Sequence, residues 1–287
     1  MIDKKRLALI DLDTLVFIVA SRQWTNGNRD NPEQVKNHVK EYVNTILINT
    51  RADFYTSVYQ AKGHSNYRKY FYPDYKANRP ESPEFFIHWK DTIVEAFIEL
   101  GAVGLKVIES DDAVSIGYYK YKDEYDCIIV SGDKDLNQIP GEHYNPSKNI
   151  SYFVHEVDAN INLMIQVLAG DDSDGIKGIY GIGAKWNYEK HQFDAPKARK
   201  ILNSSNDVTR NIQEAYEVAY PSVERLDVPL DTYTWVYSDW YSKYLKCMFL
   251  VTLLKDINYF TYPFNEEVTE LFNIVPVTTQ VTTNLFD

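Results

Sequence analysis

Carboxylates recur along this chain directly after short apolar runs. In the clearest case, Cys127 to Leu136, the residues Cys-Ile-Ile-Val are followed by Ser-Gly and then by Asp133 and Asp135. A short run rich in β-branched residues predicts a strand that is buried on both faces, as parallel strands between helices are. Open α/β sheets bind ligands at the carboxyl ends of their strands. Two carboxylates at that point predict a metal site; the alternative is that Asp133 caps a helix.

Three more acidic groups lie at comparable places. The apolar run 7–10 ends in two aspartates, of which Asp11 is the sharper ligand candidate because Asp13 could instead cap the next helix. A second run, 105–108, ends in three carboxylates, more than a cap requires. A helical segment, 161–168, leads into the last acidic group. The candidate ligands are Asp11, Glu109, Asp111, Asp112, Asp133, Asp135, Asp171 and Asp174.

Helical periodicity fills the intervals between these runs. Apolar residues recur at helical spacing in 35–47 and in 89–100. Strand and helix alternate through Leu136, which predicts an α/β fold, a mostly parallel twisted sheet with helices on both faces. A turn over 140–149 and an edge strand at 152–154 follow. The expected domains are an α/β core at 1–158, a helical region at 159–257 and a C-terminal tail at 258–287.

A basic and aromatic stretch, 62–83, interrupts the α/β pattern. Its cations, Arg68, Lys69, Lys76 and Arg79, could hold phosphates, and its tyrosines could stack on unpaired bases. The alternative is a solvated loop whose tyrosines pack on the core.

Closely spaced glycines follow the last acidic group. No buried strand precedes them in the frame that a dinucleotide-binding fingerprint needs. They predict a hairpin between helices that brings backbone amides close to a phosphate backbone. The residues expected to contact DNA here are Lys177, Gly181, Gly183 and Lys185.

Composition sets wider bounds. The 287 residues are 44% hydrophobic, enough for a full core, and no apolar run approaches the roughly 18 residues of a membrane span. Cys127 and Cys247 are expected to be core thiols in a reducing compartment, so we expect a cytoplasmic protein. The net charge of −11 is unusual for a nucleic-acid binder. Metal ions among the carboxylates would offset much of that charge locally.

In their order along the chain, these motifs resemble the 5′-nuclease family. Its members are flap endonucleases, bacteriophage 5′–3′ exonucleases and the 5′-nuclease domain of bacterial DNA polymerase I, and the phage members are the most similar. The resemblance covers residues 7–185 and rests on five motifs in register: Ile-Asp11, the basic stretch ending in Lys76-Ala-Asn-Arg79, Glu109-Ser-Asp111-Asp112, Ser-Gly-Asp133-Lys-Asp135, and Gly-Asp171-Asp-Ser-Asp174 with Gly-Ile-Gly-Ala-Lys185 after it.

The resemblance implies a PIN-like nuclease core and a two-metal phosphodiesterase. Lys76 and Arg79 would contact the scissile phosphate, and residues 62–88, including Arg68 and Lys69, would form an arch over a single-stranded 5′ end. The glycine hairpin would be a helix-hairpin-helix element that grips duplex DNA and often holds a K⁺ in this family. The first Mg²⁺ or Mn²⁺ would be held by Asp11, Glu109, Asp111, Asp112 and Asp133, and the second by Asp135, Asp171 and Asp174.

The expected substrate is DNA with a 5′ single-stranded end or flap beside a duplex, in the host cytoplasm if a phage encodes the chain. RNA of an RNA–DNA hybrid stays open as a second substrate. Gln60 stands where most of the family has an aspartate, which is expected to weaken the first metal site. The alternative function is therefore a DNA-binding accessory protein that has lost turnover. For the terminal segment 284–287 two interpretations remain, docking to a replication partner and a frayed end.

Overall fold

The computed structural model describes residues 4–220, 240–256 and 272–277, which form two compact units. The first unit comprises residues 4–70, 80–156 and the described residues from 253 onward, and the second comprises residues 71–79 and the described part of 157–252. The terminal segment 284–287 lies outside the described residues. No helix in the described part of the chain is long and apolar enough to cross a membrane.

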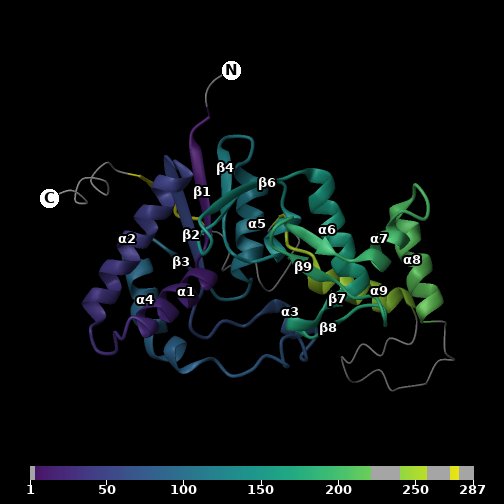
Figure 1. Cartoon of the computed structure of the whole chain (residues 1–287), viewed down its shortest axis with the longest axis horizontal. Helices are drawn as coiled ribbons and strands as arrows, with labels where there is room; N and C mark the ends of the chain where they lie inside the picture. The colour runs from purple at the N-terminus through teal and green to yellow at the C-terminus, as the bar shows by residue number, and fades with distance from the viewer. Residues whose placement is uncertain (1–3, 221–239, 257–271, 278–287) are drawn as a thin grey trace. The chain divides into compact units, whose positions relative to one another are not determined.

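A mixed sheet forms the centre of the first unit (Figure 1). The strand order is β11-β2-β1-β4-β5-β6, and β3 also pairs with β2. Strands β1 to β5 are parallel where they pair, whereas β6 and β11 run antiparallel to their neighbours. The strands are β1 (Arg6–Asp11), β2 (Phe54–Gln60), β3 (Val103–Leu105), β4 (Asp126–Val130), β5 (Gly141–Asn145), β6 (Ile150–Val154) and β11 (Val275–Pro276).

Helices cover both faces of this sheet, as the strand–helix alternation predicts. Because side chains alternate along a strand, Ala8 and Ile10 of β1 pack into the core formed by α1, α2 and α4, whereas Leu9 lies beside Gly117 of α5. The mostly parallel α/β fold is thereby confirmed. The helices are α1 (Leu12–Thr25), α2 (Pro32–Thr50), α3 (Tyr67–Phe71), α4 (Glu84–Glu99), α5 (Ser110–Tyr121) and the short 3-10 helix η1 (Asp135–Gln138).

Three details of the first unit differ from the prediction. The strand expected at 105–108 is β3, which ends at Leu105. The turn expected at 140–149 contains β5, whose polar sequence gives no strand signal but which pairs with β4 and β6 on its two sides. Val275 and Pro276 of the expected tail form β11 against the first half of β2. Pairing with neighbouring strands, rather than local propensity, decides all three.

The second unit is mainly helical. Its core lies between α6, α8 and α9, where the Tyr216 hydroxyl donates to the Val167 carbonyl at 2.5 Å. Cys247 of this core and Cys127 of β4 are both buried free thiols. The elements are α6 (Glu156–Ala169), β7 (Gly170–Asp171), the 3-10 helix η2 (Asp172–Asp174), β8 (Ile176–Lys177), β9 (Lys185–Asn187), β10 (Gln192–Asp194), α7 (Pro196–Leu202), α8 (Val208–Ala219) and α9 (Trp240–Val251).

The glycine-rich segment is more elaborate than a hairpin placed directly between two helices. Strands β7 and β8 pair antiparallel after α6, and a second antiparallel pair, β9 and β10, precedes α7. Glycine at 170 and 178 allows the first pair to approach closely. A Cβ on Gly170 would lie 2.3 Å from the Ile176 carbonyl oxygen, and one on Gly178 would lie 2.2 Å from the Ala169 carbonyl carbon.

Candidate metal centre

Carboxylates of two adjacent parallel strands meet at the carboxyl edge of the first unit's sheet. Ile10 of β1 pairs with Val130 of β4, so Asp11 lies beside Ser131. The Ser131 hydroxyl donates to Asp11 Oδ2 at 2.8 Å and accepts from the Asp133 backbone N–H at 2.9 Å. Ser131 thus joins the two acidic motifs. Sequence reasoning did not single it out, although its place between a strand and an aspartate was a usable signal.

Asp133 lies in an environment that opposes its ionisation. Burial, and then the negative charges of Asp135 and Asp11, raise the pKa of the Asp133 carboxyl from 3.8 to about 7. Asp133 Oδ1 accepts from the Asp135 backbone N–H at 2.9 Å, and Lys134 Nζ lies 3.0 Å from Asp135 Oδ1. A cation close to Asp133 would lower the pKa of this carboxyl and allow it to ionise, so the site favours a bound cation.

The helix cap expected of Asp13 is made by Asp11 instead. Asp11 caps α1, since its Oδ1 accepts from the Asp13 backbone N–H at 3.1 Å. Asp13 instead accepts from the Gln60 backbone N–H at 3.1 Å and from the Ser110 hydroxyl at 2.8 Å. Burial and the charge of Asp11 raise the pKa of Asp13 to about 6. With Asp11, Asp133, Glu109 and Asp111, Asp13 therefore forms one acidic cluster, although its sequence position had offered it as a helix cap.

The third motif lies at the start of α5. Glu109, Asp111 and Asp112 each offer an oxygen within 4.8 Å of the others, a spacing that could hold a metal ion. Arg68 already pairs with two of them. Its Nη1 lies 2.8 Å from Glu109 Oε2, and its two terminal nitrogens lie 2.5 and 2.9 Å from the Asp112 oxygens.

Arg68 was expected to contact DNA, but its side chain is only 2% exposed and pairs with Glu109 and Asp112 instead of facing solvent. Asp112 is fully buried, and its Oδ1 also accepts from the Leu254 backbone N–H at 3.0 Å. With both oxygens engaged, Asp112 is better placed to hold Arg68 than to bind a metal ion. The neighbouring Lys69 is exposed, as a phosphate contact requires.

The second unit gathers cations around Asp174. Lys76 Nζ lies 3.6 Å from Asp174 Oδ2, Arg79 pairs with Asp174 Oδ1, and the Tyr75 hydroxyl donates to Oδ2 at 3.1 Å. Lys76 adopts a left-handed backbone (φ 59°), and its N–H donates to the Asp174 carbonyl at 2.9 Å. Asp171 lies at the start of η2, where its Oδ1 accepts from the Ser173 N–H at 2.9 Å. The two residues expected at the scissile phosphate thus lie beside an expected metal ligand.

The residues expected to contact duplex DNA lie on the surface of the second unit. Lys177 and Lys185 are exposed, and Lys177 pairs with Asp172. Gly181 has a left-handed backbone (φ 78°), whereas Gly183 does not. A Cβ at Gly183 would meet no atom within 4 Å. No contact within the described residues therefore requires glycine at 183.

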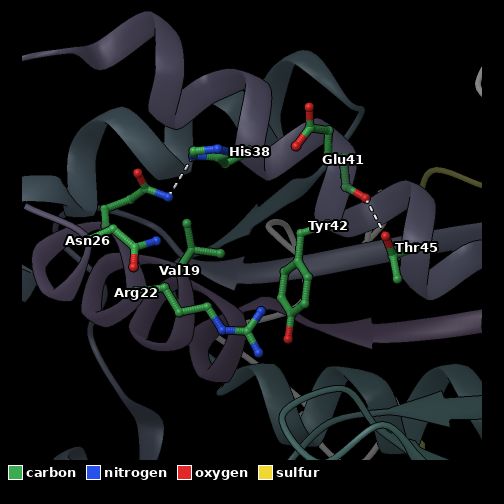
Figure 2. A pocket seen from close by; sticks show the side chains of 8 residues that line it. Val19, Arg22, Asn26, His38, Glu41, Tyr42 and Thr45 are labelled. Carbon is green, nitrogen blue, oxygen red and sulfur yellow. Dashed lines mark hydrogen bonds between the residues drawn. The ribbon is translucent and has the colours of Figure 1, made fainter. Parts of the chain in front are cut away.

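A cavity of about 250 Å³ lies elsewhere, between α1 and α2 (Figure 2). Arg22 from α1 and Glu41, Tyr42 and His38 from α2 line it, and the Arg22 guanidinium lies 4.8 Å from the centre of the Tyr42 ring. None of the predicted site residues lines this cavity. The acidic cluster, not the cavity, is therefore the candidate centre.

Known proteins resemble the chain in both sequence and fold. The chain is 32% identical over 142 residues to a 5′-3′ exonuclease of Bacillus subtilis. The match covers 44% of this chain and 48% of that protein. It is 28% identical over 177 residues to DNA polymerase I of Mycobacterium tuberculosis, which is 54% of this chain and 19% of the polymerase. The chain thus matches about half or less of the length of these relatives.

Solved structures of nucleases from bacteriophage T5 share the fold of this chain. The T5 5′-exonuclease with bound zinc has a TM-score of 0.62 at 17% identity and covers 87% of this chain and 90% of its own. The T5 flap endonuclease in a pseudo-enzyme–product complex with DNA and metal ions has a TM-score of 0.60 at 16% identity, covering 87% and 89%. The family model of the 5′-3′ exonuclease N-terminal resolvase-like domain matches residues 6–162, more than half of the chain, and the chain therefore belongs to that family.

Proposed function

We propose that this chain is a divalent-metal-dependent 5′-nuclease that hydrolyses phosphodiester bonds of DNA at a 5′ single-stranded end or flap beside a duplex. One observation carries the proposal. Carboxylates from three separate segments, the β1–α1 junction, the start of α5 and the end of β4, meet at one edge of the first unit's sheet. Two of them, Asp13 and Asp133, have raised pKa values. Such a cluster favours a divalent cation with hard oxygen ligands, Mg²⁺ or Mn²⁺.

The donor set of the first unit fits such an ion. We propose Asp11, Glu109, Asp111 and Asp133 as its ligands. A bound ion of this kind lowers the pKa of a coordinated water and offsets charge on the phosphate. Ser131 holds Asp11 and the Asp133 backbone in register through hydrogen bonds of 2.8 and 2.9 Å. Such supporting contacts orient the ligands, and their loss typically lowers metal affinity about 10- to 100-fold.

A two-metal mechanism is part of the proposal. Asp171 and Asp174, both in the second unit, are the proposed ligands of a second ion. Lys76 and Arg79 would neutralise charge that develops on the phosphate in the transition state. Their ion pairs with Asp174 support this assignment, because they keep both cations beside a proposed ligand.

DNA recognition is assigned to the exposed basic residues and the glycine segment. Lys69, Lys177 and Lys185 are proposed phosphate contacts. Gly183 supports a close approach of DNA to the backbone, since its φ is not left-handed and no neighbour among the described residues would exclude a side chain there. The proposed substrates include RNA in an RNA–DNA hybrid.

A single assay tests the proposal. Purified protein is incubated with 5′-flap, nicked and single-stranded DNA, and with a flap whose 5′ strand is RNA, in Mg²⁺ or EDTA. We expect cleavage near the junction in Mg²⁺ only, and its loss in Asp133→Asn. Binding of the flap without cleavage in either Mg²⁺ or Mn²⁺ would instead support the accessory-protein alternative.

A further inference from the structure

Asp13 lies at the carboxyl edge of the sheet although it belongs to a helix. Helix α1 starts at Leu12, directly after β1 ends at Asp11, so no connecting residue carries the chain away from the edge. The Asp13 side chain reaches two other segments. Its Oδ1 accepts from the backbone N–H of Gln60, and its Oδ2 accepts from the hydroxyl of Ser110.

These two contacts place a negative charge where the sheet otherwise lacks one. Strand β2 lies next to β1, and its last residue, Gln60, brings no formal charge. The neighbouring β1 ends in Asp11, and β4 leads into Asp133. The Asp13 carboxylate, 3.1 Å from the Gln60 nitrogen, lies at the uncharged strand end.

We propose that Asp13 is a positioning residue of the metal centre that supplies the charge missing at the end of β2. The inference rests on the proposed function, because it presumes a divalent ion at this edge. Asp13 acts in two ways. Its charge attracts the ion, and its bond to Ser110 holds the start of α5, where Glu109 and Asp111 flank that serine.

The Asp13 carboxylate and a hydrated Mg²⁺ ion can interact in this way. A carboxylate has about four acceptor positions, and the bonds from Gln60 and Ser110 use two of them. Mg²⁺ usually keeps several of its waters when it binds a protein. Asp13 can therefore accept hydrogen bonds from the water shell of an ion without contacting the ion. Loss of such an outer contact typically lowers metal affinity about 10- to 100-fold.

The inference changes what is expected of Gln60. In a site that lacks a charge at β2, Gln60→Asp would strengthen metal binding. In a site where Asp13 already provides that charge, the new carboxylate would lie close to an existing one and repel it. We therefore expect Gln60→Asp to help only when Asp13 has been neutralised.

Mn²⁺ binding to the full chain without DNA, measured by titration calorimetry and by electron paramagnetic resonance of free Mn²⁺, tests this. We expect Asp13→Asn to lower affinity at least about 10-fold. Gln60→Asp added to Asp13→Asn should restore it to within about 3-fold of wild type, and Gln60→Asp alone should raise it less than about 3-fold. Asp53→Asn is the matched control. It removes a carboxylate at the opposite end of β2 that likewise accepts a backbone N–H, from Arg6 at 2.8 Å.

Several outcomes overturn the inference. Asp13→Asn with wild-type affinity would do so, as would a double variant no better than Asp13→Asn. Should Asp13→Asn fail to fold, Gln60→Asp alone decides, since a 10-fold gain in affinity would show that Asp13 does not fill the site. Wild-type protein that binds no Mn²⁺ overturns both this inference and the proposed function. Protein that binds Mn²⁺ through Asp13 but cleaves no DNA overturns only the nuclease.

Discussion

Neutralising Asp133 should stabilise the metal-free protein. The pKa of this carboxyl is raised from 3.8 to about 7, so between these values the folded state holds a proton that the unfolded state releases. Stability then falls as the pH rises through this window, and the loss is complete above pH 7. A difference of about three pH units corresponds to about 4 kcal/mol. We expect about 2–4 kcal/mol, because the side chain keeps some contact with solvent.

Asp133→Asn removes this cost with little change of shape. The amide oxygen can still accept from the Asp135 N–H, as Oδ1 does at 2.9 Å. Without metal at pH 8 the variant should melt about 5–10 °C above wild type, and at pH 4 the two should melt together. Mg²⁺ at pH 8 should reverse the order, because it stabilises the protein that binds it.

The measurement is thermal unfolding followed by far-UV circular dichroism at pH 4, 6 and 8, with EDTA or with Mg²⁺. Asp123→Asn is the control, since Asp123 is an exposed carboxylate after α5 and its loss changes the net charge equally. A melting difference between Asp133→Asn and wild type that is the same at pH 4 and pH 8 would show that ionisation of Asp133 does not cause it. So would an equal rise in Asp123→Asn.

Four further outcomes test the DNA contacts. Lys76→Ala should lower kcat about 100-fold with little change in KM, and a change confined to KM would contradict its role at the phosphate. Lys185→Ala should reduce the slope of log affinity for duplex against log salt by about 0.9, and an unchanged slope would exclude a phosphate contact. Gly183→Ala should fold normally yet bind duplex more weakly, whereas unchanged binding would remove the argument for close approach. Lys197 Nζ donates to the Gly181 carbonyl at 2.9 Å, so its ammonium group occupies a carbonyl that a K⁺ in the glycine hairpin would need. K⁺ and Na⁺ at equal ionic strength should therefore support duplex binding equally in wild type. In Lys197→Met, where that carbonyl loses the ammonium group, K⁺ should support binding better than Na⁺.

The positions of the acidic motifs could be predicted because parallel strands impose them. Asp11 and Asp133 each follow a short apolar run, and parallel strands put such residues at the same edge. The distance between them in sequence did not matter. The same reasoning could not find β5, since a strand that pairs on both sides needs little apolar pattern of its own.

The helix cap at Asp11 rather than at Asp13 shows a different limit. Capping preferences do not distinguish two aspartates two residues apart, because either can precede a helix. The junction decides. Because α1 starts immediately after β1, the first aspartate takes the cap and the second turns toward Gln60 and Ser110, which are 47 and 97 residues away in sequence.

Arg68 shows why charge pattern misled. Within a basic stretch it has the same sequence signature as its exposed neighbour Lys69, and only its partners, 41 and 44 residues away, distinguish the two. A planar guanidinium can bind two carboxylates at once, which suits Arg rather than Lys for a buried position. The local composition contained no sign of this pairing.

The pairing of Arg68 also divides the acidic cluster into two parts, which differ in how far a protein cation already offsets their negative charge. On one side, Glu109 and Asp112 already have a buried cation, so their charges are offset when no metal ion is bound. On the other side, Asp13 and Asp133 accept hydrogen bonds from uncharged N–H and O–H groups and have raised pKa values. A divalent ion binds most favourably to carboxylates whose charge no protein cation already offsets, and these are Asp13 and Asp133. Metal affinity should therefore depend more on Asp13 and Asp133 than on Asp112, whose neutralisation would leave Arg68 with an unpaired share of charge and cost stability instead.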